Sequence, residues 1–280
     1  MHLVIQGADV ETRDLKQLAK LSAADAIDRL ADTAFRLRNA QPAAGIAELC
    51  ASAKLDHGFV PENRRLTDFK LLVMDMDSTL ITMETIDELA DMVGIKAEVA
   101  KITESAMRGE IEYDESLRRR LALLKGLDQS ALQRVYDERL RFSPGAEIML
   151  GKIRAAGIKT LLVSGGFSYM TDRLKARVKL DYTHSNTLEI SNGKLTGAVT
   201  GDIVNADVKR ASLLRVAAEL GVSRAQIAGV GDGANDLKFM AECGVSVAYR
   251  AKPVVREKTT YALNHSGLDA MLWLLSAGID

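Results

Sequence analysis

Four short apolar runs after residue 68 constrain the fold more than any other feature of the chain. Continuous runs of this length are typical of strands that are buried on both faces of a parallel sheet. Each of the first three is followed at once by small or polar residues and then by a helical pattern. This alternation predicts an α/β fold with a doubly wound parallel sheet. Ligands bind beyond the carboxyl ends of such strands, so the chemistry is expected there. The runs are KLLVM (70–74), KTLLV (159–163), IAGV (227–230) and VSVA (245–248).

Two insertions interrupt this pattern. A crossover between parallel strands needs only about a dozen residues, whereas residues 81–142 separate the first two strands and are rich in charges and good helix formers. We therefore expect a small helical cap over the strand ends. A second insertion, residues 181–201, contains Asn192-Gly193, a strong hairpin-turn signal.

Residues 1–66 are predicted to form a separate N-terminal domain, with residues 67–280 as the core. Leu3–Ile5 is a short apolar strand, and apolar spacing predicts a helix from about Leu15 to Arg38. Gln41-Pro42 would end that helix, and a second helix is expected at about residues 43–55. No motif with evident chemistry lies in this segment.

Composition excludes several classes of protein. Lys and Arg total 37 and Asp and Glu total 38, giving a net charge of −1, which predicts no nucleic-acid or membrane partner. Two distant cysteines, Cys50 and Cys243, predict neither a disulfide framework nor a cysteine zinc site. Neither a secretory signal nor a membrane span is evident. We expect a cytoplasmic protein that acts on a small molecule; a homodimer is compatible with the sequence but not specified by it.

Four polar motifs follow or accompany the predicted strands. Asp75 and Asp77, two residues apart after a strand, can face one crevice. The SGGF loop offers a hydroxyl and flexible backbone N–H groups, which suit an anion. Taken singly, each motif has a structural interpretation, namely a solvated helix cap, a tight turn or a surface lysine. The motifs are DMDST (75–79), SGGF (164–167), Lys209 and GDGAND (231–236).

The joint occurrence of the motifs decides between these interpretations. GVGDGAND does not fit the dinucleotide fingerprint, and Asp232 and Asp236 would repel a pyrophosphate. Mg²⁺ prefers carboxylate, water and phosphate oxygens. With Mg²⁺ on the acids, Ser164 and Lys209 can hold a phosphate while one acid remains to attack it. The set predicts a metal-assisted phosphoryl-transfer site.

This order of motifs resembles the haloacid dehalogenase superfamily of aspartate-nucleophile phosphatases, and within it the phosphoserine phosphatases. The resemblance covers roughly residues 66–280. It rests on DMDST with Glu84 nine residues after Asp75, on LRRRLALLKGL (117–127), LLVSGGF (161–167), Lys209 and GVGDGANDLKFM (229–240).

The resemblance implies a role for each matching residue. Asp75 would be the nucleophile that forms an aspartyl-phosphate, and Asp77 the general acid and base. Asp75, the Asp77 backbone carbonyl and Asp232 would bind Mg²⁺, with Asp236 steadying them, and Ser164, Gly165 and Lys209 would bind the phosphate.

The remaining residues would contact other parts of the substrate. Asn235 would lie near the attacking water or the substrate, Glu84 would pair with the substrate ammonium, and Arg120 would pair with its carboxylate. Met107 and Tyr113 would close the pocket.

Two positions depart from the family pattern. The family often has phenylalanine where Tyr113 stands. Longer members carry a regulatory ACT domain at the N-terminus, but residues 1–66 offer too few predicted strands for its βαββαβ plan. We therefore interpret them as a degenerate or divergent ACT-like domain.

The implied function is Mg²⁺-dependent hydrolysis of O-phospho-L-serine in L-serine synthesis. One alternative is a phosphatase for another small phosphomonoester such as phosphohomoserine, because Glu84 and Arg120 suit any phosphorylated amino acid. The other is a non-catalytic amino-acid sensor on the same scaffold. The presence of Asp75, Asp77, Lys209 and Asp232 together argues against a sensor, which has no need of a nucleophile.

Overall fold

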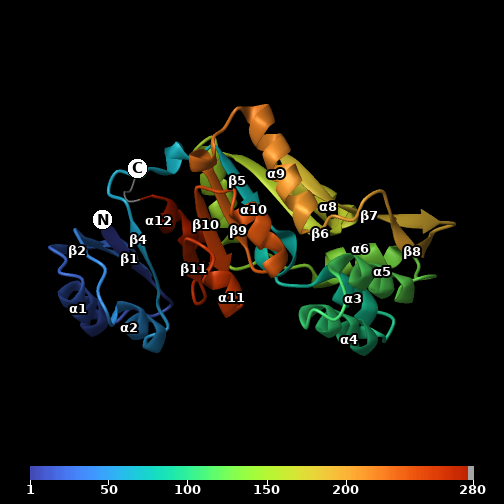
Figure 1. Ribbon diagram of the computed structural model, residues 1–280, viewed down its shortest axis with the longest axis horizontal. Coiled ribbons are helices and arrows are strands. Elements are labelled where there is room, and N and C mark those ends of the chain that lie inside the picture. The colour runs from blue at the N-terminus through green and yellow to red at the C-terminus, as the bar shows by residue number, and fades with distance from the viewer. Residues whose placement is uncertain (277–280) are drawn as a thin grey trace.

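The computed structural model describes residues 1–276, and within them the predicted parallel sheet is present (Figure 1). Its strand order is β11-β10-β9-β5-β6-β7-β8. Neighbours pair in parallel except β7 and β8, which are antiparallel. The α/β class and the four apolar strands are confirmed. The strands are β5 (Leu71–Met74), β6 (Lys159–Phe167), β7 (Tyr182–Ser191), β8 (Lys194–Thr200), β9 (Ile227–Gly231), β10 (Val245–Tyr249) and β11 (Tyr261–Leu263).

Helices cover both faces of this sheet, which explains the continuous apolar runs. Leu71 and Val73 of β5 belong to the same hydrophobic cluster as α9 and α10. The alternate residues, Leu72 and Met74, belong to a second cluster with α7, α8 and α12. No helix among residues 1–276 has the length and apolar character to cross a membrane. The helices are α7 (Ala146–Ala155), α8 (Ser168–Val178), α9 (Ala206–Leu220), α10 (Leu237–Met240), α11 (Pro253–Arg256) and α12 (Met271–Leu275).

The insertion between β5 and β6 is helical, and its base is closed by a bridge between Ile81 and Phe142. It lies at one end of the core, beside the β7–β8 hairpin (Figure 1). Asn192 and Gly193 have φ of 51° and 75°, as a two-residue hairpin turn requires. The helices are α3 (Thr85–Asp91), α4 (Lys96–Met107), α5 (Tyr113–Leu123) and α6 (Ser130–Arg134).

The N-terminal segment forms a second sheet at the other end of the core (Figure 1). The predicted strand at Leu3–Ile5 and the second predicted helix are confirmed, but the long helix predicted from Leu15 to Arg38 is wrong. The strand order of this sheet is β2-β3-β1-β4, with antiparallel neighbours. The segment thus has the complete βαββαβ order that we expected to be missing. Its elements are β1 (His2–Gln6), α1 (Thr12–Leu21), β2 (Ala26–Ala31), β3 (Ala34–Arg38), α2 (Ile46–Ser52) and β4 (Asp56–Val60).

The predicted helix over residues 15–38 fails because the chain turns at Ala23, where φ is 52°. Beyond this turn, β2 and β3 form a hairpin in which Ile27 lies opposite Leu37. Leu37 in turn pairs with Leu3 of β1. Apolar spacing in a short segment fits a helix and a strand almost equally well, so only this pairing with a distant strand decides. The domain boundary at residue 66 stays a prediction.

Asp56 of β4 joins the N-terminal sheet to the core. Asp56 is 2% exposed. It accepts hydrogen bonds from three successive backbone N–H groups after β11, those of Asn264 (2.7 Å), His265 (3.0 Å) and Ser266 (2.8 Å). Nearby, the Tyr261 hydroxyl donates to the carbonyl oxygen of Phe59 at 2.8 Å.

Asp56→Ala is therefore expected to lower the free energy of unfolding by on the order of 3 kcal/mol, because three partly buried backbone donors lose a charged acceptor. Chemical denaturation measures this change. Asp32→Ala is the control, since the Asp32 side chain is 93% exposed. A loss no larger than that of the control would mean that Asp56 does not hold the two sheets together.

Candidate active site

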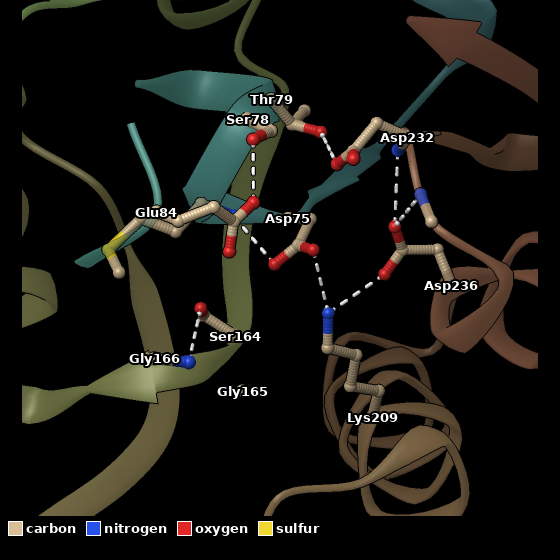
Figure 2. A network of polar contacts seen from close by, with 12 residues as sticks. Asp75, Ser78, Thr79, Glu84, Ser164, Gly165, Gly166, Lys209, Asp232 and Asp236 are labelled. Carbon is tan, nitrogen blue, oxygen red and sulfur yellow. Dashed lines mark hydrogen bonds and ion pairs between the residues drawn. The ribbon is translucent and has the colours of Figure 1, made fainter. Parts of the chain in front are cut away.

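The predicted polar motifs meet at the carboxyl ends of three adjacent strands (Figure 2). Asp75 follows β5, Ser164 lies in β6, and Asp232 follows β9. Because β5 lies between β6 and β9 in the sheet, these residues approach one another from one edge. Lys209 comes from the first turn of α9.

Lys209 is the central cation of the site. Its side chain is 1% exposed, and its Nζ lies 2.9 Å from Oδ2 of Asp75 and 2.8 Å from Oδ1 of Asp236. Burial by itself lowers the pKa of Lys209, but the charges of Asp236 and Asp75 outweigh it and raise that pKa above its ordinary value. The surface-charge interpretation of this lysine is therefore excluded.

Asp75, Asp232 and Asp236 form a carboxylate cluster, with one oxygen of each within 4.8 Å of the others. Burial, and next the charge of Asp236, raise the pKa of Asp75 well above its usual range and that of Asp232 to about 7. A single lysine leaves this cluster with excess negative charge. An all-oxygen set with such a charge fits a hard cation such as Mg²⁺.

Asp75 accepts from the Met76 N–H through Oδ1, at 2.7 Å, and lies beside Lys209 through Oδ2. Both oxygens of Asp236 are engaged as well. Oδ1 accepts from Lys209, and Oδ2 accepts from the backbone N–H groups of Asp232 (3.2 Å) and Gly233 (3.0 Å). It thus holds Lys209 and the Asp232 loop in place. This arrangement suits the supporting role expected of Asp236.

The DMDST segment turns sharply from β5 into the insertion. Ser78 has a φ of 55°, and its hydroxyl donates to Oε1 of Glu84 at 2.6 Å. Thr85 donates to Oδ1 of Asp77 at 2.7 Å. Burial, and next the charge of Glu84, raise the pKa of Asp77 to about 8. The carboxyl group expected to be the general acid therefore favours its protonated form near neutral pH.

Two threonines in this region were not among the predicted site residues. Thr79 donates to Oδ1 of Asp232 at 2.8 Å and so orients a candidate metal ligand. It belongs to the DMDST motif, which could have identified it. Thr85, which holds Asp77, belongs to no recognised pattern in the sequence.

The SGGF loop forms the end of β6, where the register with β7 shifts between Ser164 and Phe167. Its glycines and a distant asparagine shape it. Gly166 donates its N–H to Oγ of Ser164 at 2.9 Å. A Cβ on Gly166 would lie 2.6 Å from Cε of Met76 and 3.0 Å from Oδ2 of Asp77, so a larger residue there would require the Met76 side chain to shift.

Asn186 of β7 fixes the same loop and was missed in the sequence. It is 2% exposed. Its Nδ2 donates to the carbonyl oxygen of Gly165 at 2.7 Å, and its Oδ1 accepts from the N–H of Val204 at 2.9 Å. It thereby ties the SGGF loop to the segment that leads into α9. No local pattern marks one asparagine of a hairpin strand for this role.

Glu84 and Arg120 are the charged residues that the insertion contributes. Glu84 lies at the start of α3, and Arg120 lies on α5, where its Nε donates to the carbonyl oxygen of Ser116 at 3.3 Å. Burial raises the pKa of Glu84 above its ordinary value. The hydrogen bond from Ser78 and the charges of Arg120 and Lys209 oppose this rise without cancelling it. Glu84 therefore lies within the electrostatic reach of Arg120 and Lys209.

Two further predicted residues lie at the edge of this arrangement. Asn235 is half-buried in the turn after β9 (residues 234–236). Met107 is 66% exposed, and its Sδ accepts from Nζ of Lys252 at 3.2 Å. Met107 thus connects the insertion to the core at an exposed rim, whereas we expected it to close the pocket.

Comparison with known proteins gives two family matches and a close relative. Residues 69–244 match the haloacid dehalogenase-like hydrolases, and residues 3–46 match a domain of unknown function, DUF4072. A phosphoserine phosphatase from Polaromonas sp. is 52% identical over 216 residues, which cover 75% of this chain and 92% of that protein.

Two solved structures extend the similarity over the N-terminal sheet. A haloacid dehalogenase family hydrolase from Salmonella enterica serovar Typhi has a TM-score of 0.88 at 34% identity, covering 98% of this chain and 97% of that one. The unliganded probable phosphoserine phosphatase from Vibrio cholerae has a TM-score of 0.86 at 35% identity, covering 99% of this chain and 86% of that one.

Proposed function

Because the chain belongs to the haloacid dehalogenase-like hydrolases, and within them to the phosphoserine phosphatases, we propose that it hydrolyses O-phospho-L-serine to L-serine and phosphate. The observation that carries this proposal is that charged residues of the core and charged residues of the helical insertion contribute to one site. The core contributes Asp75 and Lys209 in direct contact, and the helical insertion contributes Glu84 and Arg120. The first pair suits a phosphoryl group, and the second suits the ammonium and carboxylate of an amino acid.

In this proposal, Asp75 attacks the phosphorus atom, and the bond between phosphorus and the serine oxygen breaks. Asp77 donates its proton to that oxygen and later takes a proton from the water that hydrolyses the aspartyl-phosphate. Thr85 holds the Asp77 carboxyl group during both steps. Ser164, Gly165 and Lys209 bind the phosphoryl oxygens, and Asn235 lies near the water or the substrate.

A divalent metal is part of the proposal because the donor set fits one. Asp75, Asp232 and the backbone carbonyl of Asp77 would hold Mg²⁺, with Asp236 steadying Asp232. When bound, the ion neutralises charge on the phosphoryl group. The non-catalytic sensor alternative is set aside because the relatives are enzymes. The cytoplasmic location, a homodimer and a role in L-serine synthesis stay predictions.

Arg120→Ala tests the substrate assignment. Its loss is expected to lower kcat/KM for phosphoserine about ten- to a hundredfold, as for the loss of a charge-assisted hydrogen bond. The kcat/KM for p-nitrophenyl phosphate, which has neither charged group, should hardly change. Steady-state kinetics on both substrates measures the contrast.

Arg118→Ala is the matched control, because Arg118 lies on the same helix and is exposed. An equal loss of Arg120→Ala on both substrates, or no loss on either, would remove the reason for choosing phosphoserine. The kcat/KM for phosphohomoserine, compared with that for phosphoserine, would show how strongly the site discriminates between substrates of different length.

A further inference from the structure

Tyr113, the first residue of α5, lies against the loop that is proposed to hold phosphate. A Cβ built on Gly165 would overlap the Tyr113 hydroxyl oxygen and lie 3.3 Å from Cζ of that ring. Gly165 is not among the glycines with positive φ, so space and not backbone conformation requires a glycine here. The Tyr113 hydroxyl, which belongs to the insertion, therefore lies directly against the backbone of the SGGF loop at Gly165.

The Tyr113 hydroxyl is placed among the charges of the site. Burial raises the pKa of Tyr113 to about 12; the charges of Lys209 and Arg120 oppose this effect, and those of Asp75 and Asp77 add to it. The hydroxyl is thus protonated at neutral pH. It makes no hydrogen bond with any residue that the structure describes, so its proton is available to a ligand.

The residue beside Tyr113 fixes its position relative to Lys209. Nδ2 of Asn205 donates to Oδ1 of Asp114 at 3.2 Å. Asn205 also begins α9, where its Oδ1 accepts from the N–H groups of Asp207 (3.1 Å) and Val208 (3.2 Å). The first turn of α5 is therefore joined to the helix that carries Lys209.

We propose that Tyr113 is a phosphate-binding residue whose O–H donates to a phosphoryl oxygen beside Ser164 and Gly165. The insertion would then recognise the phosphoryl group through Tyr113 and the amino-acid part through Glu84 and Arg120. This inference rests on the proposed function. It assigns a ligand to the hydroxyl that distinguishes Tyr113 from a phenylalanine.

Tyr113→Phe tests the inference, because it removes the hydroxyl and keeps the ring. Binding of inorganic phosphate in the presence of Mg²⁺, measured by calorimetry, should weaken about tenfold or more. The kcat/KM should fall by a similar factor for phosphoserine and for p-nitrophenyl phosphate, which share the phosphoryl group. Tyr182→Phe is the control, since the Tyr182 hydroxyl donates to Glu219 at 2.8 Å on the exposed surface.

The outcomes separate the two proposals. Unchanged phosphate binding in a Tyr113→Phe variant that melts like the wild type would overturn the role of Tyr113. A loss on phosphoserine alone would also overturn it, because the hydroxyl would then contact the amino-acid part. If the wild type binds phosphate but hydrolyses neither substrate, the proposed function fails, and the calorimetric comparison still decides the role of Tyr113.

Discussion

Asp75→Asn is expected to lower the turnover of phosphoserine by about 10⁴-fold or more, the usual cost of removing a covalent nucleophile. An amide cannot form the aspartyl-phosphate, and in the proposed mechanism the other two carboxylates of the cluster bind the metal or support that binding. Single-turnover and steady-state kinetics measure the loss. A variant that keeps a tenth of the wild-type rate would show that Asp75 is not the nucleophile.

The Asp75→Asn protein should remain folded. Burial and the nearby Asp236 disfavour the charged form of Asp75, as its raised pKa indicates, and Lys209 keeps its contact with Asp236. A melting curve close to that of the wild type would therefore accompany the loss of activity. Asp91→Asn, at an exposed carboxylate of the insertion paired with Arg139, is the control and should leave the rate unchanged.

Removal of divalent metal is the second large effect that we expect. Exhaustive chelation should lower the rate by at least about 10³-fold, because a bound cation contributes several kcal/mol of charge stabilisation. Added Mg²⁺ should restore the rate. Ca²⁺ should bind without supporting turnover, since it prefers longer bonds and more ligands. Full activity after chelation would contradict the metal site.

A binding measurement separates the metal site from the reaction. Mg²⁺ should raise the melting temperature of the wild type, because a ligand that binds only the folded state stabilises it. Asp232→Asn should abolish this rise, since Asp232 is a carboxylate of the cluster. An equal rise in both proteins would place the ion elsewhere.

The sequence by itself determined the core sheet and the composition of the site. Buried parallel strands carry their signal locally, as unbroken apolar runs, and the carboxyl ends of adjacent parallel strands must lie at one edge of the sheet. Asp75, Ser164 and Asp232 could therefore be placed together without knowing a single contact. Lys209 and the insertion followed from their position between these strands.

Only the tertiary structure decided the contacts that join distant segments. Leu37 pairs with Leu3, and this pairing makes a hairpin strand of a segment whose apolar spacing also fits a helix. Asn186 reaches the Gly165 carbonyl from another strand, and the Tyr113 hydroxyl meets Gly165 from the insertion. Such contacts depend on residues that are far apart in the chain. Local periodicity and motif spacing therefore do not predict them.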